Sequence, residues 1–196
     1  MEDISKKFTN LYQRISSPEF LKMESLGGEI PFFISAYDPR QEVAVSESVK
    51  LLKNKLEAAG ISVLEINLYD IVCDILDSKG GVQRMFDIEK GKSKYKFLNA
   101  LQSTLNIHLI LTPRIKELID DNPSQVYFLT GIGLVYPYIR SHNILNNLQN
   151  IAKGSPTVIF FPGEYNGNSL NLFGEMKDDN YYRAFNIDII STQYDH

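Results

Sequence analysis

Four short, almost wholly apolar runs constrain the fold of this chain more than any other feature of its sequence. They lie at residues 31–36 (PFFISA), 61–66, 126–129 and 157–161. Runs of this length and composition are typical of strands that are covered on both faces, as in a parallel sheet. Segments with helical periodicity separate them, so the order of elements predicts an α/β fold.

Helix signals surround these runs. Asp3 and Ser17 are expected to cap two N-terminal helices within residues 1–28, and Gly60 is expected to end the helix between the first two strands. A further helix is expected from about residue 136 to 152, between the third and fourth strands.

Residues 67–125 have several helical patterns and no convincing strand, apart from an ambiguous run at 107–111. We therefore expect a helical insertion after the second strand. Near the other end of the chain, residues 187–190 predict an edge strand.

Together these patterns predict a single α/β domain over residues 1–196. The expected architecture is a three-layer sandwich with a mainly parallel, Rossmann-like central sheet of 4–5 strands flanked by helices. The first two strands and the helix between them read as a βαβ unit, in which we expect the two strands to pair directly and in parallel.

Composition narrows the possible partners and the cellular location. The formal charge is −4, and the only basic segment, residues 90–96 (KGKSKYK), is typical of a solvated helix start, so direct nucleic-acid binding is expected to be weak or absent. The single cysteine, Cys73, excludes an internal disulfide and is expected to be buried and inert. With no apolar stretch near the ~18 residues that span a bilayer, and no secretion signal at the start, a cytoplasmic location without membrane contact is expected.

A ligand site is expected at the carboxyl ends of the strands, because loops converge there in open parallel sheets. The loops after the four strands are polar or rich in glycine, which is also common in loops without a ligand. The sequence has no P-loop, no G-x-S-x-G turn and no histidine spacing for a metal. We therefore assign no catalytic residue, metal ligand or cofactor, and the candidate ligand crevice consists of Asp38, Asp70, Thr130, Gly131 and Gly133.

The helix at residues 136–152 has an unusual number of asparagines on one face. Asparagine is a mediocre helix former, so its amides are expected to find partners. The face either binds a partner or supports neighbouring loops through a hydrogen-bond network. Together with an aromatic and basic segment near residue 182, the candidate partner or support face comprises Arg140, His142, Asn143, Asn146, Asn147, Tyr181, Tyr182 and Arg183.

Four blocks of the sequence resemble the BrxB family. They are PFFISAYDP, VLEINLYD, LTGIGLVYPYIRSHNILNNLQ and FFPGEYNGNSLNLFGEMKDDNYYRAF, and the resemblance spans roughly residues 18–187. Members of this family are small cytoplasmic proteins of bacterial BREX phage-defence systems. These systems also contain a DNA methyltransferase, a large ATPase and a PglZ protein with an alkaline-phosphatase-like domain.

The resemblance implies a role in antiviral defence and no established reaction. The first hypothesis is a non-catalytic accessory or assembly protein that binds another BREX protein, the PglZ-type component. The alternative is a nucleotide-binding or nucleic-acid-processing α/β enzyme that uses the crevice at the strand ends.

Overall fold

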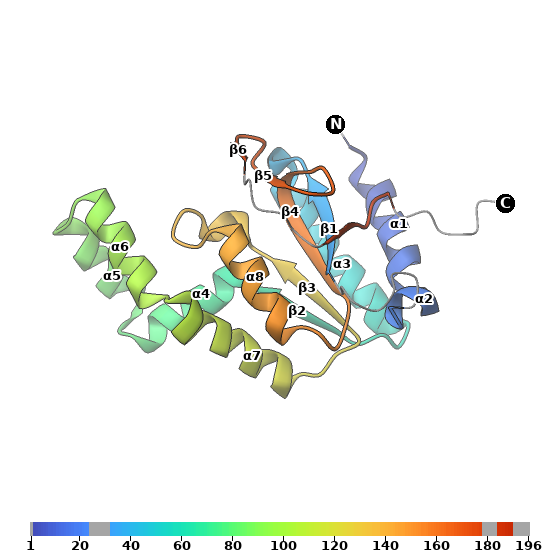
Figure 1. Ribbon diagram of the computed structural model, residues 1–196, viewed down its shortest axis with the longest axis horizontal. Coiled ribbons are helices and arrows are strands. Elements are labelled where there is room, and N and C mark those ends of the chain that lie inside the picture. The colour runs from blue at the N-terminus through green and yellow to red at the C-terminus, as the bar shows by residue number, and fades with distance from the viewer. Residues whose placement is uncertain (1, 24–31, 178–183, 190–196) are drawn as a thin grey trace.

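A computed structural model describes residues 2–23, 32–177 and 184–189 (Figure 1). Its centre is a parallel sheet in the order β2-β3-β4-β1-β7, and a short antiparallel hairpin extends it from β4. The strands are β1 (Phe32–Tyr37), β2 (Val63–Asn67), β3 (Val126–Thr130), β4 (Thr157–Tyr165), β5 (Leu170–Leu172), β6 (Met176–Lys177) and β7 (Phe185–Asn186).

The first two helices begin at the capping residues that the sequence indicates. Asp3 accepts a hydrogen bond from the Lys6 amide at the start of α1, and Ser17 accepts one from the Phe20 amide at the start of α2. None of the helices in the described ranges is long and apolar enough to cross a membrane. The α-helices are α1 (Ile4–Ile15), α2 (Pro18–Leu21), α3 (Glu42–Ala58), α4 (Leu68–Ser78), α5 (Gly81–Lys90), α6 (Lys94–Thr104), α7 (Thr112–Asp121) and α8 (Ser141–Ile151).

Alternation along the strands divides the interior into two cores, which confirms the three-layer architecture. Phe33 of β1 faces a core built with α1, α2 and α3. Its neighbours Phe32 and Ile34 face the other core, built with α4, α7 and α8. Since successive side chains of a strand point to opposite faces, a strand that is apolar at every position requires cover on both sides.

The strand order corrects one expectation. β1 and β2 are parallel members of the same sheet, but they are not neighbours, because β3 and β4 lie between them. β1 pairs with β4 over six residues, from Phe32↔Thr157 to Tyr37↔Pro162. The crossover is made by α3, which packs on the face of the sheet that carries Phe128 of β3 and Phe160 of β4, the two intervening strands.

Residues 68–121 form the expected helical insertion of α4 to α7, and the ambiguous run at Ile107–Leu111 is one turn of π-helix, η3. The helix after β3 begins later than expected. A 3-10 turn, η4 (Gly133–Val135), and a further turn at residues 136–138 precede it, and Pro137 restricts Tyr136 at the start of this turn to an extended backbone. The edge strand lies at Phe185–Asn186, two residues before its expected position.

A partly buried ion pair fastens α1 to the segment after β7. The Lys7 ammonium lies 2.9 Å from Asp188 Oδ2 and 3.2 Å from Glu2 Oε1, and it donates a 2.7 Å hydrogen bond to the Ala36 carbonyl. The Ser35 hydroxyl lies 3.3 Å from Asp188 Oδ1. Burial raises the pKa of Asp188 above its usual value, while Lys7 opposes that rise.

This geometry predicts that Lys7→Met destabilises the fold in a pH-dependent way. Removing one partner leaves a buried carboxylate without its cation, which costs about 3 kcal/mol at neutral pH. The pKa of Asp188 then rises further above its unfolded value. A raised acid pKa means that stability is lost as pH increases through the shifted pKa, so the deficit shrinks in acid, where the folded variant holds Asp188 in its protonated form.

Urea unfolding of Lys7→Met and wild type at pH 4.5 and pH 7.5 measures the effect. For this chain length we expect the free energy of unfolding to fall by roughly 2 kcal/mol or more per molar urea. Lys6→Met is the matched control, because Lys6 is an exposed neighbour on the same helix. An equal deficit at both pH values would contradict the role of Asp188.

Candidate functional site

The carboxyl end of β2 caps a helix. Asn67, the last residue of β2, accepts hydrogen bonds from the amides of Tyr69 at 3.0 Å and Asp70 at 3.4 Å. Two of the amides that α4 presents at its N-terminus are therefore bonded to a side chain of the protein itself. Asp70, one of the expected crevice residues, lies exposed in the first turn of α4.

The loop after β3 packs tightly against that cap. Thr130 donates a 2.9 Å hydrogen bond to Glu65 Oε1 of β2. Gly131 has a φ of +75°, and a Cβ at this position would lie 2.6 Å from Asn67 Oδ1. A Cβ on Gly133 would lie 2.9 Å from Pro162 Cγ. The two glycines thus let neighbouring protein atoms approach closely, at the place where the sequence suggests a ligand.

The remaining crevice residue belongs to another strand. Asp38 follows β1, accepts hydrogen bonds from the Arg40 side chain and amide, and is paired with that guanidinium at 2.5 Å. The Arg40 hydrogen bonds lower the pKa of Asp38 to about 2. Because β3 and β4 separate β1 from β2, the strands that precede Asp38 and Asp70 lie about 14 Å apart. Among the described residues, no three His, Cys, Asp or Glu side chains gather as metal ligands would.

Aromatic side chains cover the surface above this packed region. Tyr69 of α4 is 45% exposed, and Leu134 of η4 is 50% exposed. Tyr138 is half-buried and donates a 3.2 Å hydrogen bond to the Leu134 carbonyl. The thiol of Cys73 raises the pKa of Tyr69, and burial followed by the proximity of Tyr69 raises the pKa of Tyr138. We call Tyr69, Cys73, Leu134 and Tyr138 the tyrosine surface.

The tyrosine surface was not expected from the sequence. Its members come from two segments, YDIVC within α4 and the LVYPY turn after β3, which are more than sixty positions apart in the chain. The available signal was that a tyrosine stands among apolar residues in each of these segments. Cys73 is half-buried, and so its expected full burial was wrong.

The polar face of α8 is divided between internal contacts and solvent. Asn147 donates a 2.6 Å hydrogen bond to the Asn143 carbonyl, and its Oδ1 lies 3.1 Å from His108 Nδ1. His108 is exposed on η3, so this pair joins α8 to the insertion. Arg140 is exposed at the N-cap position, before the helix begins.

The other members of the expected face differ in exposure. His142 and Asn143 are half-buried in the first turn of α8, and Asn146 is exposed. Tyr181, Tyr182 and Arg183 lie outside the described residues. The structure therefore places Asn147 in a supporting network and leaves Arg140 and Asn146 accessible.

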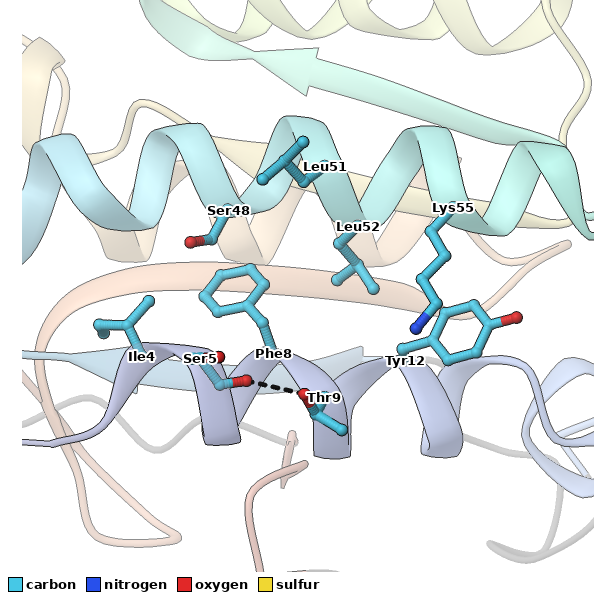
Figure 2. A pocket seen from close by; sticks show the side chains of 9 residues that line it. All are labelled: Ile4, Ser5, Phe8, Thr9, Tyr12, Ser48, Leu51, Leu52 and Lys55. Carbon is cyan, nitrogen blue, oxygen red and sulfur yellow. Dashed lines mark hydrogen bonds between the residues drawn. The ribbon is translucent and has the colours of Figure 1, made fainter.

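A shallow groove lies on the opposite face of the sheet, between α1 and α3 (Figure 2). Its volume is about 460 Å³. The Lys55 ammonium sits 3.9 Å from the centre of the Tyr12 ring at one end, and Thr9 donates a 2.9 Å hydrogen bond to the Ser5 carbonyl. Figure 2 shows that apolar and hydroxyl side chains line it; they are Ile4, Ser5, Phe8, Thr9, Tyr12, Ser48, Leu51, Leu52 and Lys55.

The close packing of Gly131 predicts a stability defect for Gly131→Ala. The substitution combines an unfavourable positive φ with a contact of 2.6 Å, so we expect the free energy of unfolding to fall by about 2–3 kcal/mol. Chemical denaturation measures this change.

Two matched controls separate the causes of that defect. Gly167→Ala tests positive φ alone, since φ is +93° and no atom lies within 4 Å of its Cβ position. Gly154→Ala tests neither cause, because its Cβ position is open and its φ lies outside the left-handed region. A Gly131→Ala variant no less stable than Gly167→Ala would show that the contact with Asn67 is unimportant.

Comparison with known proteins gives consistent matches. The family model described as "BREX protein BrxB" matches residues 64–187, which run from β2 to β7. A BREX protein BrxB of Bacillus cereus (strain H3081.97) is 39% identical over 189 residues, which is 95% of this chain and 98% of the relative. A BREX protein BrxB of Escherichia coli O9:H4 (strain HS) is 29% identical over 181 residues, covering 92% and 90% of the two chains.

No solved structure matches the chain. The matched segment contains the capped start of α4, the glycine turn after β3, the tyrosine surface and the whole of α8. The expected resemblance is confirmed by two relatives that are aligned over nearly their full lengths, and the chain belongs to the BrxB family of BREX proteins.

Proposed function

We propose that this protein is a non-catalytic assembly component of a cytoplasmic BREX antiphage system, and that it binds another protein of the system. The partner we propose is the PglZ-type component, which the family resemblance implies. Membership of the BrxB family makes other BREX proteins the natural partners.

The observation that carries this proposal is the tyrosine surface. Tyrosine supplies a large rigid contact area and a polar hydroxyl, and it is enriched among residues that anchor protein interfaces. Tyr69 and Leu134 are each about half exposed, although Ile132 and Val135 on either side of Leu134 are buried. A partner that covers them would remove apolar area from water at about 25 cal/mol per Å².

The packing beneath the tyrosine surface also supports docking. In open α/β sheets a small ligand enters the crevice at the carboxyl ends of the strands. Here Asn67 bonds the amides of Tyr69 and Asp70, and Gly131 lies directly against that cap. A rigid base of this kind lowers the entropy that a protein interface loses on binding.

The α8 network extends this support to the insertion. The Asn147–His108 contact holds η3 against α8, and Asn106 fixes the first turn of η3 by accepting hydrogen bonds from the amides of His108 and Leu109. Asn146 remains exposed on the same helix, and Arg140 remains exposed at its start, two residues after Tyr138 in the chain.

Leu134→Asp is predicted to disrupt the complex. It places a charge in the centre of the proposed interface, so we expect binding to the PglZ-type partner to weaken at least 30-fold, the equivalent of a 2 kcal/mol hot spot. Co-purification with the tagged partner, followed by calorimetric titration, measures this loss.

Leu51→Asp is the matched control, because Leu51 is 69% exposed and lines the groove on the other face of the sheet. Both variants should retain the wild-type melting temperature within a few degrees. If the wild-type protein forms no complex at micromolar concentration, the assembly role is wrong. If Leu51→Asp alone abolishes the complex, the partner binds in the α1–α3 groove and the tyrosine surface is not the interface.

A further inference from the structure

The α5–α6 hairpin projects from the body at the end of the long axis that is remote from α1 (Figure 1). It contributes little to the core, since α6 has no buried residue and Met85 is the buried residue of α5. The turn between the helices and its flanks, residues 90–96, are exposed at every position. We call these seven residues, KGKSKYK, the hairpin tip.

Charge is unevenly distributed between the hairpin and the rest of the protein. Residues 84–96 carry five basic and two acidic side chains, a net charge of +3, whereas the whole chain has a net charge of −4. The remaining residues therefore carry −7. At the tip, Lys90 pairs with Asp87 at 3.4 Å, and no carboxylate in the described part of the chain lies within ion-pairing distance of Lys92, Lys94 or Lys96.

The length of the hairpin separates the tip from the acidic body. The 11 residues of α6 extend about 16 Å, which is about twice the Debye length of ~8 Å at physiological ionic strength. Salt thus screens the tip from most of the negative charge on the body. An anion that approaches the tip meets mainly its lysines.

We propose that the hairpin tip binds nucleic acid, with its lysines on the phosphate backbone and Tyr95 stacked on an unpaired base. Tyr95 is 72% exposed and stands between two lysines in the sequence. Aromatic side chains interleaved with cations bind single strands without sequence preference. The cations at the tip are all lysines, which contact phosphate as point charges and lack the planar fork with which arginine reads bases.

An acidic protein segment is the competing ligand for the same charges. The tip favours nucleic acid because its one aromatic ring is 72% exposed, as a platform for base stacking must be. Anchors of protein interfaces lie in well-packed pockets. The protein binds nucleic acid weakly, as its negative net charge predicts, and it does so at the hairpin tip. This inference does not depend on the PglZ-type partner.

Fluorescence anisotropy of the full chain with a labelled single-stranded thymidine oligonucleotide tests the proposal. Four phosphate contacts give a salt slope of about −3, so affinity should fall about 50-fold between 50 and 200 mM monovalent salt. Each phosphate contact raises the affinity about fivefold at 0.1 M salt. The double variant Lys92→Gln/Lys94→Gln should therefore bind the oligonucleotide about 25-fold more weakly, and its salt slope should be half that of the wild type.

The double variant Lys50→Gln/Lys53→Gln is the matched control, because it makes the same change in net charge on α3 of the body. It should change affinity less than threefold. Equal losses in the two double variants, or no binding at low salt, would overturn the proposal.

Two further comparisons identify the ligand class. Tyr95→Ser should weaken binding of the single strand about fivefold or more while leaving a duplex of the same length unaffected, and equal losses for both would overturn the stacking role. Polyglutamate of matched charge should compete poorly. If it displaces the oligonucleotide at equal concentration, the tip binds acidic protein segments and the nucleic-acid assignment is wrong.

Discussion

The parallel pairing of β1 with β4 is the constraint on which the rest of the structure depends. It joins a strand near the beginning of the chain to one near its end, over six registered residue pairs. β3 then adds to the free side of β4, and β7 adds to the free side of β1. Because β1 and β4 are buried on both faces, both helical layers pack against this pair.

The pairing also determines what lies at the carboxyl end of the sheet. With β1 next to β4, the loop after β1 is separated from those after β2 and β3, where Asn67 and Gly131 meet. The carboxyl end is therefore divided. One part is a closely packed base beneath exposed tyrosines, and the other is the Asp38–Arg40 turn, whose charges neutralise each other.

The two regions proposed to bind partners differ in the physical basis of recognition. The tyrosine surface lies on a rigid base and offers apolar area, which suits a folded protein partner. The hairpin tip offers charge at the end of a thin helical pair and suits a flexible polyanion. Since α4 begins at the tyrosine surface and continues into the α5–α6 hairpin, a single insertion connects the two regions.

The sequence by itself determined the elements of this protein, its fold class and its family. Strands covered on both faces follow from uninterrupted apolar runs such as PFFISA, and helix starts follow from local caps such as Asp3 and Ser17, whose partners lie within three residues. Only the tertiary structure decided the strand order, the half-exposed position of Cys73, and the contacts of Tyr69 with Tyr138 and of His108 with Asn147. The physical reason is that periodicity records whether a side chain is buried, whereas it does not record which distant segment covers it.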